Sequence, residues 1–340
     1  MLYTLKRGYK KVEKGLFLGI PMWLIFSLIA TFAWGLEDVF LKVIAKKGSP
    51  HFSLKISTCT GVISVPFLFY LTNKSESGLS LLNLLMSDLT LLLMCIAYTL
   101  VLVIAFIGAK YLDASIYAPI ENASNGFEII MILGYAFITG NYSHVSNSIT
   151  PLSISGMVLT IGGIIVLVIA QKSINDKALK LDPQNKMYRN GTLALLFPLG
   201  VCIIDALSTV LDSINLGVTG EAVIGVFDYM RFYTFANVVV GVLSWLIIFF
   251  RTKKAYNPFR KGERFNYSCS ISENSANVFY IFAMSQNAIL SIPVTTSYCI
   301  VTLILSRIFL KEKLNFVQKI CVTAVVVGVM LISLVGLEEG

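Results

Sequence analysis

The sequence predicts an all-α polytopic membrane protein with ten transmembrane helices, arranged as two inverted five-helix repeats. The first observation behind this is composition: 56% of the 340 residues are hydrophobic and 14% are charged, whereas soluble proteins carry about 25% charged residues. The second is that the apolar residues fall into ten long stretches, and the third is a weak internal repeat. Because the deficit of charge extends along the whole chain, a soluble enzyme with one membrane anchor is excluded.

Each predicted span contains about 20 mainly apolar residues, which is the length needed to cross a bilayer. The basic segment 1–14 precedes an apolar stretch that is too long for the core of a signal peptide, so we expect the first helix to be retained. The eighth span is unusually polar. In chain order the predicted spans are 22–43, 54–71, 89–109, 115–138, 152–170, 192–211, 223–250, 270–289, 292–310 and 316–335.

An internal repeat relates the two halves of the chain. A shift of 288 − 114 = 174 residues places segment 114–119 on segment 288–293, and a shift of 328 − 163 = 165 places Gly163 on Gly328. Each copy holds five spans, and an odd number forces the copies into opposite orientations, as in transporters that work by alternating access. The predicted division is a first repeat at 1–172, a central basic loop at 173–190 and a second repeat at 191–340.

Eight carboxylates lie inside predicted spans. At roughly 2.5–3.5 kcal/mol each, eight lipid-facing acids would cost on the order of 20 kcal/mol, more than a typical folding stability of about 5–15 kcal/mol. They are therefore expected to face a cavity or protein partners, or to be protonated. The eight are Glu37, Asp38, Glu121, Glu128, Asp205, Asp212, Asp228 and Glu273.

The spacing of polar residues favours a cavity, because positions three, four and seven apart share one face of a helix. Stripes of this kind run along the fourth span (117, 121, 124, 125, 128), the sixth (205, 208, 209, 212) and the eighth (270, 273, 277, 280). Position 124 corresponds to 298 in the ninth span. The predicted substrate-binding or coupling residues are Glu37, Tyr117, Glu121, Asn125, Glu128, Asp205, Glu273, Asn277 and Tyr298.

Other intramembrane polar residues have a structural interpretation. Asp228 and Arg231 are three residues apart and are predicted to form a structural ion pair. Asp38 and Lys42, four apart, admit the same interpretation. Serine and threonine side chains also join membrane helices by hydrogen bonds. Burial disfavours the charged form of a carboxyl, so Glu121, Glu128 and Glu273 are expected either to exchange protons during a cycle or to pair with a cationic substrate.

Several motifs resemble the EamA-type branch of the drug/metabolite transporter (DMT) superfamily. They are TrpGly at 34–35, SerIleProValThrThrSerTyr at 291–298 and LeuSerArgIlePheLeuLysGluLys at 305–313. The resemblance covers essentially the whole chain and implies a ten-helix secondary transporter. The family's glutamate after the ninth helix matches Glu312, while the first copy has IleThrGlyAsn at 138–141 instead. The motifs of phosphate translocators and of nucleotide-sugar carriers are not found.

The predicted function is a secondary carrier that moves a small polar metabolite, such as an amine, an amino acid or a polyol, across the cell membrane, with or without proton coupling. A non-transporting receptor or assembly protein and an intramembrane enzyme are the alternatives. No cofactor, metal or nucleic acid is expected, since the six cysteines are scattered and the two histidines, His51 and His144, lie at predicted helix ends. Small residues in the fifth and tenth spans suit close helix packing or a homodimer contact.

Basic residues separate the two sides of the membrane. The odd-numbered connections hold 16 Lys and Arg, whereas the even connections and the termini hold six, of which five lie in the first 14 residues. The positive-inside rule therefore favours cytoplasmic odd connections and external termini. The basic N-terminal tail favours the opposite orientation.

Overall fold

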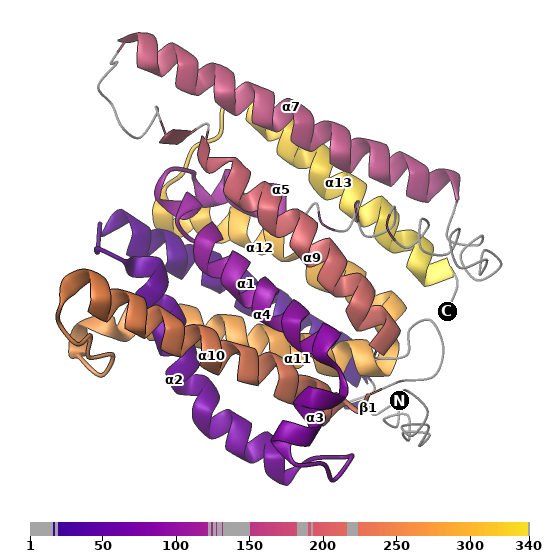
Figure 1. Cartoon of the computed structure of the whole chain (residues 1–340). Coiled ribbons are helices and arrows are strands. Elements are labelled where there is room, and N and C mark those ends of the chain that lie inside the picture. Colours follow the sequence, from indigo (N-terminus) through magenta and orange to yellow (C-terminus); the bar gives the residue numbers. More distant parts are fainter. Residues whose placement is uncertain are drawn as a thin grey trace.

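The computed structural model describes residues 16–17, 20–121, 124, 127, 131, 150–181, 190–191, 193–215 and 224–338. This part of the chain is helical apart from a minimal antiparallel hairpin, in which β1 (Leu16–Phe17) pairs with β2 (Ile20–Pro21). The predicted all-α class is confirmed for these residues. The principal helices are α1 (Met22–Lys46), α2 (Phe52–Asn73), α3 (Leu81–Ser87), α4 (Leu89–Ala105), α5 (Ala114–Glu121), α7 (Pro151–Leu181), α9 (Leu196–Asn215), α10 (Val226–Thr252), α11 (Arg264–Thr296), α12 (Tyr298–Leu305) and α13 (Phe316–Glu338) (Figure 1).

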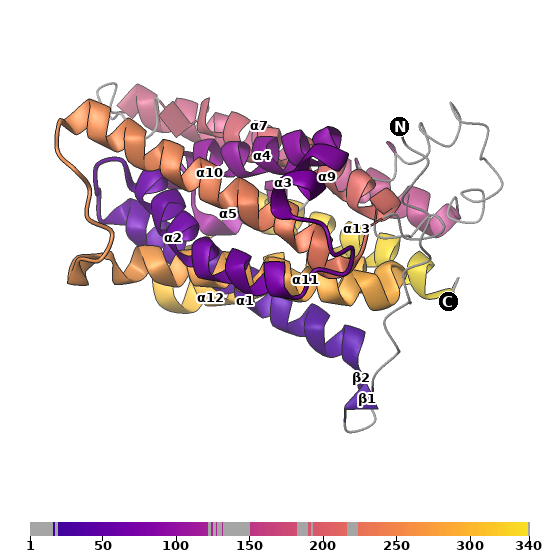
Figure 2. The ribbon, with the colours of Figure 1, turned by 60° about the horizontal axis from the view of Figure 1, so that its bottom comes forward.

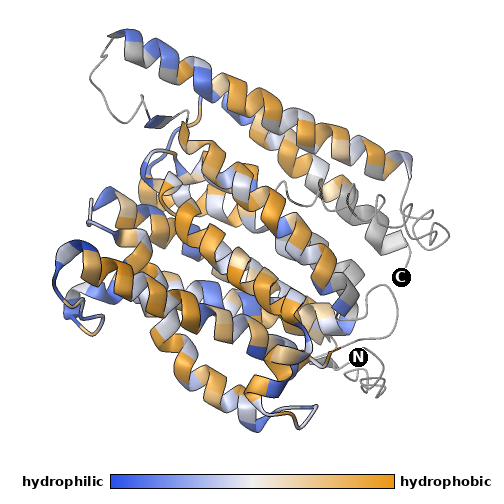
Figure 3. Cartoon of the chain, viewed as in Figure 1, coloured by the Kyte–Doolittle hydropathy of each residue, from blue (hydrophilic) through white to orange (hydrophobic). Residues whose placement is uncertain are grey.

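Within the described residues, five helical stretches are long and apolar enough to cross a membrane: Met22–Lys46, Phe52–Asn73, Leu89–Lys110, Ile154–Ile174 and Val226–Thr252. Two shorter apolar stretches, Tyr298–Leu310 and Phe316–Gly328, follow. Apolar residues make up most of the helices and polar residues gather toward the helix ends (Figure 3). Many large apolar side chains are exposed, among them Leu28, Phe32 and Phe69. Soluble monomers rarely expose apolar surface on this scale, so the arrangement is that of a membrane-embedded helical protein.

The helices pack as pairs from distant parts of the sequence. α1 lies along α11, α2 lies along α10, α7 lies along α13, and α4 packs on α9. Figure 2 shows the β1–β2 hairpin projecting beyond the start of α1. In the view of Figure 1, α7 and α13 form one edge of the bundle and α2 lies at the opposite edge. α1, α4, α5, α9 and α12 therefore occupy the interior layers, where the polar stripes predicted from the sequence meet.

Glycine permits the closest of these contacts. A Cβ atom built on Gly61 of α2 would lie 2.9 Å from the Cα of Gly241 in α10, and one built on Gly241 would lie 2.7 Å from the Cα of Gly61. Carbon atoms normally pack about 3.5–4.0 Å apart. The two backbones can meet at this crossing only because both residues lack a side chain.

The break between the predicted eighth and ninth spans lies elsewhere than expected. The sequence places it at 290–291, just before Pro293, but α11 continues to Thr296 and the chain turns at Ser297. Proline removes a backbone donor at its own position, yet the helix tightens four residues later. There the Ser297 amide donates to the Val294 carbonyl (3.2 Å) and the Ser297 hydroxyl donates to the same oxygen (2.6 Å). Of the predicted fourth span, Ala114–Glu121 is seen as helix, and most of the remainder lies outside the described residues.

Candidate functional site

A polar cavity of about 100 Å³ lies between the interior helices. Side chains of α1, α4, α5, α9, α10, α11 and α12 line it, so helices from both halves of the chain contribute. Among the described residues, its lining includes six carboxyls and no Lys, Arg or His. The six carboxyls belong to Glu37, Asp38, Glu121, Asp205, Asp212 and Glu273.

Glu273 receives hydrogen bonds from three helices. The indole Nε1 of Trp34 in α1 donates to its Oε2 (3.0 Å), the amide of Asn277 donates to its Oε1 (2.8 Å), and the hydroxyl of Tyr233 in α10 lies 3.4 Å from Oε1. The Asn277 amide also donates to the Tyr233 hydroxyl (2.9 Å). Donors from three helices fix the carboxyl in one orientation at the wall of the cavity.

Aromatic rings form much of the remaining wall. The ring of Trp34 lies 5.4 Å from that of Tyr280 and 5.7 Å from that of Tyr298, and Tyr98 lies 6.4 Å from Tyr233. These separations lie within the range of packed aromatic pairs. The faces of such rings attract cations, so the aromatic wall and the carboxyls favour the same sign of ligand charge.

Two adjacent acids on α1 close another side of the cavity. Asp38 accepts a hydrogen bond from Thr302 of α12 (2.7 Å), and Glu37 lies 3.6 Å from the Cys269 thiol of α11. Gly35 allows this approach, because a Cβ at that position would lie 2.5 Å from Val301 of α12. The contact between α1 and α12 thus fixes where the two acids lie.

The α9 stripe supplies two further acids, and Glu121 of α5 is the sixth. The Ser124 hydroxyl forms a hydrogen bond with Asp205, and the Tyr229 hydroxyl of α10 donates to Asp212. On α5, the buried hydroxyl of Tyr117 also lines the cavity and has no hydrogen-bond partner among the described residues. A buried polar atom without a partner costs about 1–3 kcal/mol, so this hydroxyl is available to a ligand.

The structure brings seven of the nine predicted site residues to this one cavity. They are Glu37, Tyr117, Glu121, Asp205, Glu273, Asn277 and Tyr298. Asn125 and Glu128 lie outside the described residues. The prediction omitted Trp34, Asp38, Tyr98, Asp212 and Tyr233, all of which line the cavity. Helical spacing carried a usable signal for two of them, since Trp34 is three residues before Glu37 and Asp212 is seven residues after Asp205 on the same stripe.

The suggested pairing of Asp38 with Lys42 is wrong. Lys42 extends to the connection between α4 and α5, where its ammonium donates to the Ala109 carbonyl (2.9 Å) and lies 3.7 Å from Asp113. Asp38 is held by Thr302 instead. Spacing by four makes an intrahelical pair possible. In the connection beyond α4, however, the ammonium can donate to a backbone carbonyl and also lie near a carboxylate, which satisfies more of its hydrogen-bond donors.

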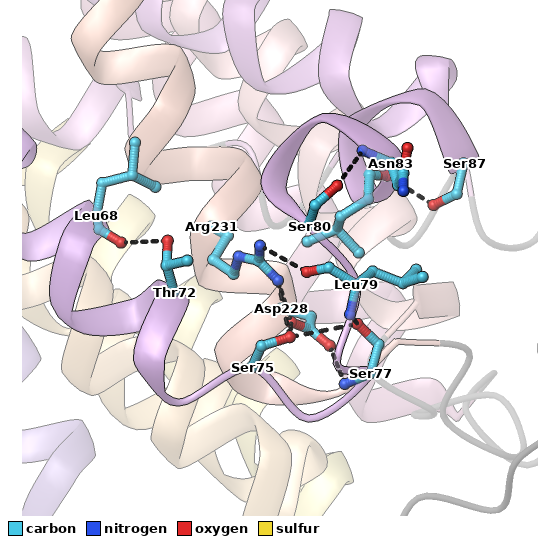
Figure 4. Close-up of polar contacts among 11 residues, drawn as sticks. Leu68, Thr72, Ser75, Ser77, Leu79, Ser80, Asn83, Ser87, Asp228 and Arg231 are labelled. Atoms are coloured by element: carbon cyan, nitrogen blue, oxygen red, sulfur yellow. Dashed lines mark hydrogen bonds and ion pairs between the residues drawn. The ribbon is translucent and has the colours of Figure 1, made fainter.

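Asp228 and Arg231 lie apart from the cavity and hold the connection that follows α2 (Figure 4). Arg231 Nη1 lies 2.9 Å from Asp228 Oδ1, and both side chains are fully buried. Asp228 also accepts from the Ser75 hydroxyl (2.9 Å) and the Ser77 amide (2.7 Å), while Arg231 donates to the Leu79 carbonyl (3.0 Å). The pair therefore has the geometry of a structural clamp on residues 75–79.

Glu312 has a structural position as well. Its Oε2 accepts from the amide (3.0 Å) and the hydroxyl (2.9 Å) of Ser115, and its Oε1 accepts from the amide of Ala114 (3.2 Å). These donors belong to the first turn of α5, so a carboxylate from the second half of the chain caps a helix of the first half.

Comparisons with known proteins bear on the fold alone. No family model matches the chain, and no curated protein matches it. Eleven chains among the solved structures match. One of them, described only as "Crystal structure of protein", aligns with a TM-score of 0.53 and 11% sequence identity over 93% of this chain and 98% of its own. At this identity the similarity indicates a shared fold and carries no information on activity.

Proposed function

We propose that the chain is a secondary carrier that moves a small polar metabolite, an amine, an amino acid or a polyol, across the cell membrane by alternating access. The observation that carries the proposal is the cavity, in which six carboxyls and several aromatic rings from both halves of the chain surround one small space. Intramembrane acids are costly, and they characteristically line substrate or ion pathways.

The helix pairing supports the inverted repeat on which alternating access depends. If the two copies are equivalent, α2 corresponds to α10 and α7 corresponds to α13, and each of these pairs packs together. If α1 also corresponds to α9 and α4 to α11, then the packing of α1 on α11 has its counterpart in the packing of α9 on α4. Both of these contacts are present. A two-fold relation between the copies accounts for all four pairings, and it agrees with ten spans and with the resemblance to EamA-type DMT transporters.

The lining indicates which substrates suit the cavity. With no basic residue among its described members, the lining would repel phosphates and other anions. Carboxyls that lack a basic partner bind either protons or the ammonium group of a substrate, and a carrier in which the two compete is proton-linked. The apolar outer faces of α7 and α13 are left for lipid or for a second copy of the chain.

Uptake into proteoliposomes tests the proposal. Glu121→Gln and Glu273→Gln, with Glu128→Gln as a third variant, are expected to lose most substrate flux and to change its dependence on pH. Asp176→Asn removes one carboxylate from an exposed position on α7 and serves as the matched control. Full activity with an unchanged pH profile in all three glutamine variants would contradict the proposal. Absence of flux with any amine, amino acid or polyol would favour a receptor instead.

A further inference from the structure

Three helices, α4, α9 and α10, run along the length of the cavity, and each places residues at both of its ends. On α9, Asp205 and Asp212 are seven residues apart on one face, or roughly 10 Å at 1.5 Å per residue. On α10, Tyr229 bonds to Asp212 and Tyr233 contacts Glu273. On α4, Cys95 lies at the Asp212 end, whereas Tyr98 lies at the end that holds Asp205 and Glu273. The cavity thus extends about two helical turns from one acidic end to the other.

The two ends differ in how many acids they hold. Asp205 lies near enough to Glu121 and Glu273 for their charges to interact. At the other end, Asp212 is the one carboxyl that the described residues supply, and Asp205 is the described carboxyl that interacts with its charge. Between the ends the wall is mixed: Ser208 and Thr209 lie between the two aspartates on α9, and Tyr280 and Ile281 of α11 also line the cavity.

Two further observations point to an organic cation. The Tyr117 hydroxyl, on a residue 2% exposed, lines the cavity without a hydrogen-bond partner among the described residues. It is a free acceptor for an N–H group. No three His, Cys, Asp or Glu side chains in the described part of the chain are grouped so as to hold a metal ion. A ligand that carries two separated positive charges fits the two acidic ends of this lining better than a single compact ion does.

We propose that the substrate is a linear diamine or a longer polyamine, an inference that rests on the proposed carrier function. One ammonium group binds among Glu273, Asp205 and Glu121 and donates to Tyr117. The methylene chain lies along the aromatic wall, whose ring faces also attract the charge. The second ammonium group binds Asp212.

A series of α,ω-diaminoalkanes tests the proposal, each compared with the 1-aminoalkane of the same carbon number. The full-length protein in proteoliposomes is assayed for binding and for uptake. The best-fitting diamine is expected to bind roughly 10-fold or more tightly than its monoamine, which is the gain from one additional charge-assisted hydrogen bond. Asp212→Asn should abolish this advantage and change monoamine affinity by less than about twofold. Asp176→Asn, which removes a carboxylate from an exposed position on α7, should retain it.

Each outcome separates the substrate class from the carrier function. Equal affinities for diamines and monoamines in the wild-type protein would overturn the diamine assignment, whether or not Asp212→Asn folds. A diamine preference that survives in a folded Asp212→Asn would overturn it too. Uptake of a neutral polyol without any diamine preference would overturn the substrate class and keep the carrier. Diamine-selective binding without uptake of any solute would overturn the carrier.

Discussion

The contact between α7 and α13 offers the most direct test of how the bundle packs. Gly162 and Gly163 are neighbours in α7, but they face different surroundings. A Cβ built on Gly163 would lie 2.9 Å from Val325 Cγ2 and 3.2 Å from the Cys321 carbonyl oxygen of α13, whereas one on Gly162 would meet nothing within 4 Å. Since carbon atoms pack about 3.5–4.0 Å apart, Gly163→Ala must push α13 outward by roughly 0.6–1 Å.

Gly162→Ala and Gly163→Ala add the same methyl group, so the difference between their stabilities measures the cost of the steric clash at Gly163. Overpacking of this size costs about 1–3 kcal/mol, while alanine gains about 0.5–1 kcal/mol of helix propensity at either position. Gly162→Ala is therefore expected to be slightly more stable than the wild-type protein, and Gly163→Ala about 1–3 kcal/mol less stable than Gly162→Ala.

Thermal melting in detergent, followed by the loss of the monodisperse peak in size-exclusion chromatography, measures this difference. At roughly 2 °C per kcal/mol for a chain of this size, Gly163→Ala should melt about 2–6 °C below Gly162→Ala. Gly328→Ala provides an independent check, because its Cβ would lie 2.7 Å from the Gly156 carbonyl oxygen. The packing argument fails if Gly163→Ala melts at or above Gly162→Ala.

Three further predictions concern charges outside the cavity. Arg231→Ala leaves Asp228 buried without its partner and should lower stability by about 3–5 kcal/mol in the same melting assay. The control is Arg251→Ala, at the exposed end of α10; an equal or smaller loss in Arg231→Ala would contradict the clamp. Glu312→Ala removes the cap that bonds Ser115 and should cost about 0.5–2 kcal/mol, and an unchanged melting temperature would refute that role. Partial burial raises the pKa of the Glu76 carboxyl above its ordinary value of 4.5, and the Asp228 carboxylate raises it further. The stability that protonated Glu76 contributes is therefore present below pH 4.5 and is lost as the pH rises through the pKa of the folded state. Glu76→Gln should therefore raise the melting temperature at neutral pH but not near pH 4, and equal effects at both pH values would exclude this cause.

The cavity could be predicted from the sequence because lipid makes polar residues informative. Inside an apolar span an acid is costly wherever it faces lipid, so the periodic stripes that hold Glu121, Asp205 and Glu273 had to face protein or a cavity. Helix geometry then gave the face, and the structure places all three on the same cavity. The sequence therefore predicts which face of each helix is turned away from lipid, because that depends only on the spacing of residues along the helix.

Contacts between helices could not be predicted in the same way. The hydrogen bond from Trp34 to Glu273 joins residues 239 positions apart, and nothing in the spacing along α1 or α11 indicates it. Lys42 was misassigned for the same reason: its partners, Ala109 and Asp113, become available only when α4 ends beside α1. Aromatic residues such as Tyr98 were missed because, within an apolar span, a tyrosine is equally compatible with a lipid-facing or a cavity-facing position.

The chain holds buried carboxyls in two contrasting ways: one has a cationic partner from the chain itself, and the other has only neutral partners. Asp228 is fully buried and has its own arginine, a serine hydroxyl and a backbone amide as partners. Glu273 is also buried, yet its partners are the neutral side chains of Trp34, Tyr233 and Asn277, and the described lining supplies no cation. Neutral donors orient a carboxyl without cancelling its charge. Under the proposed carrier function, a positive group from outside the chain, either a substrate ammonium or a proton, completes an acid held in this way.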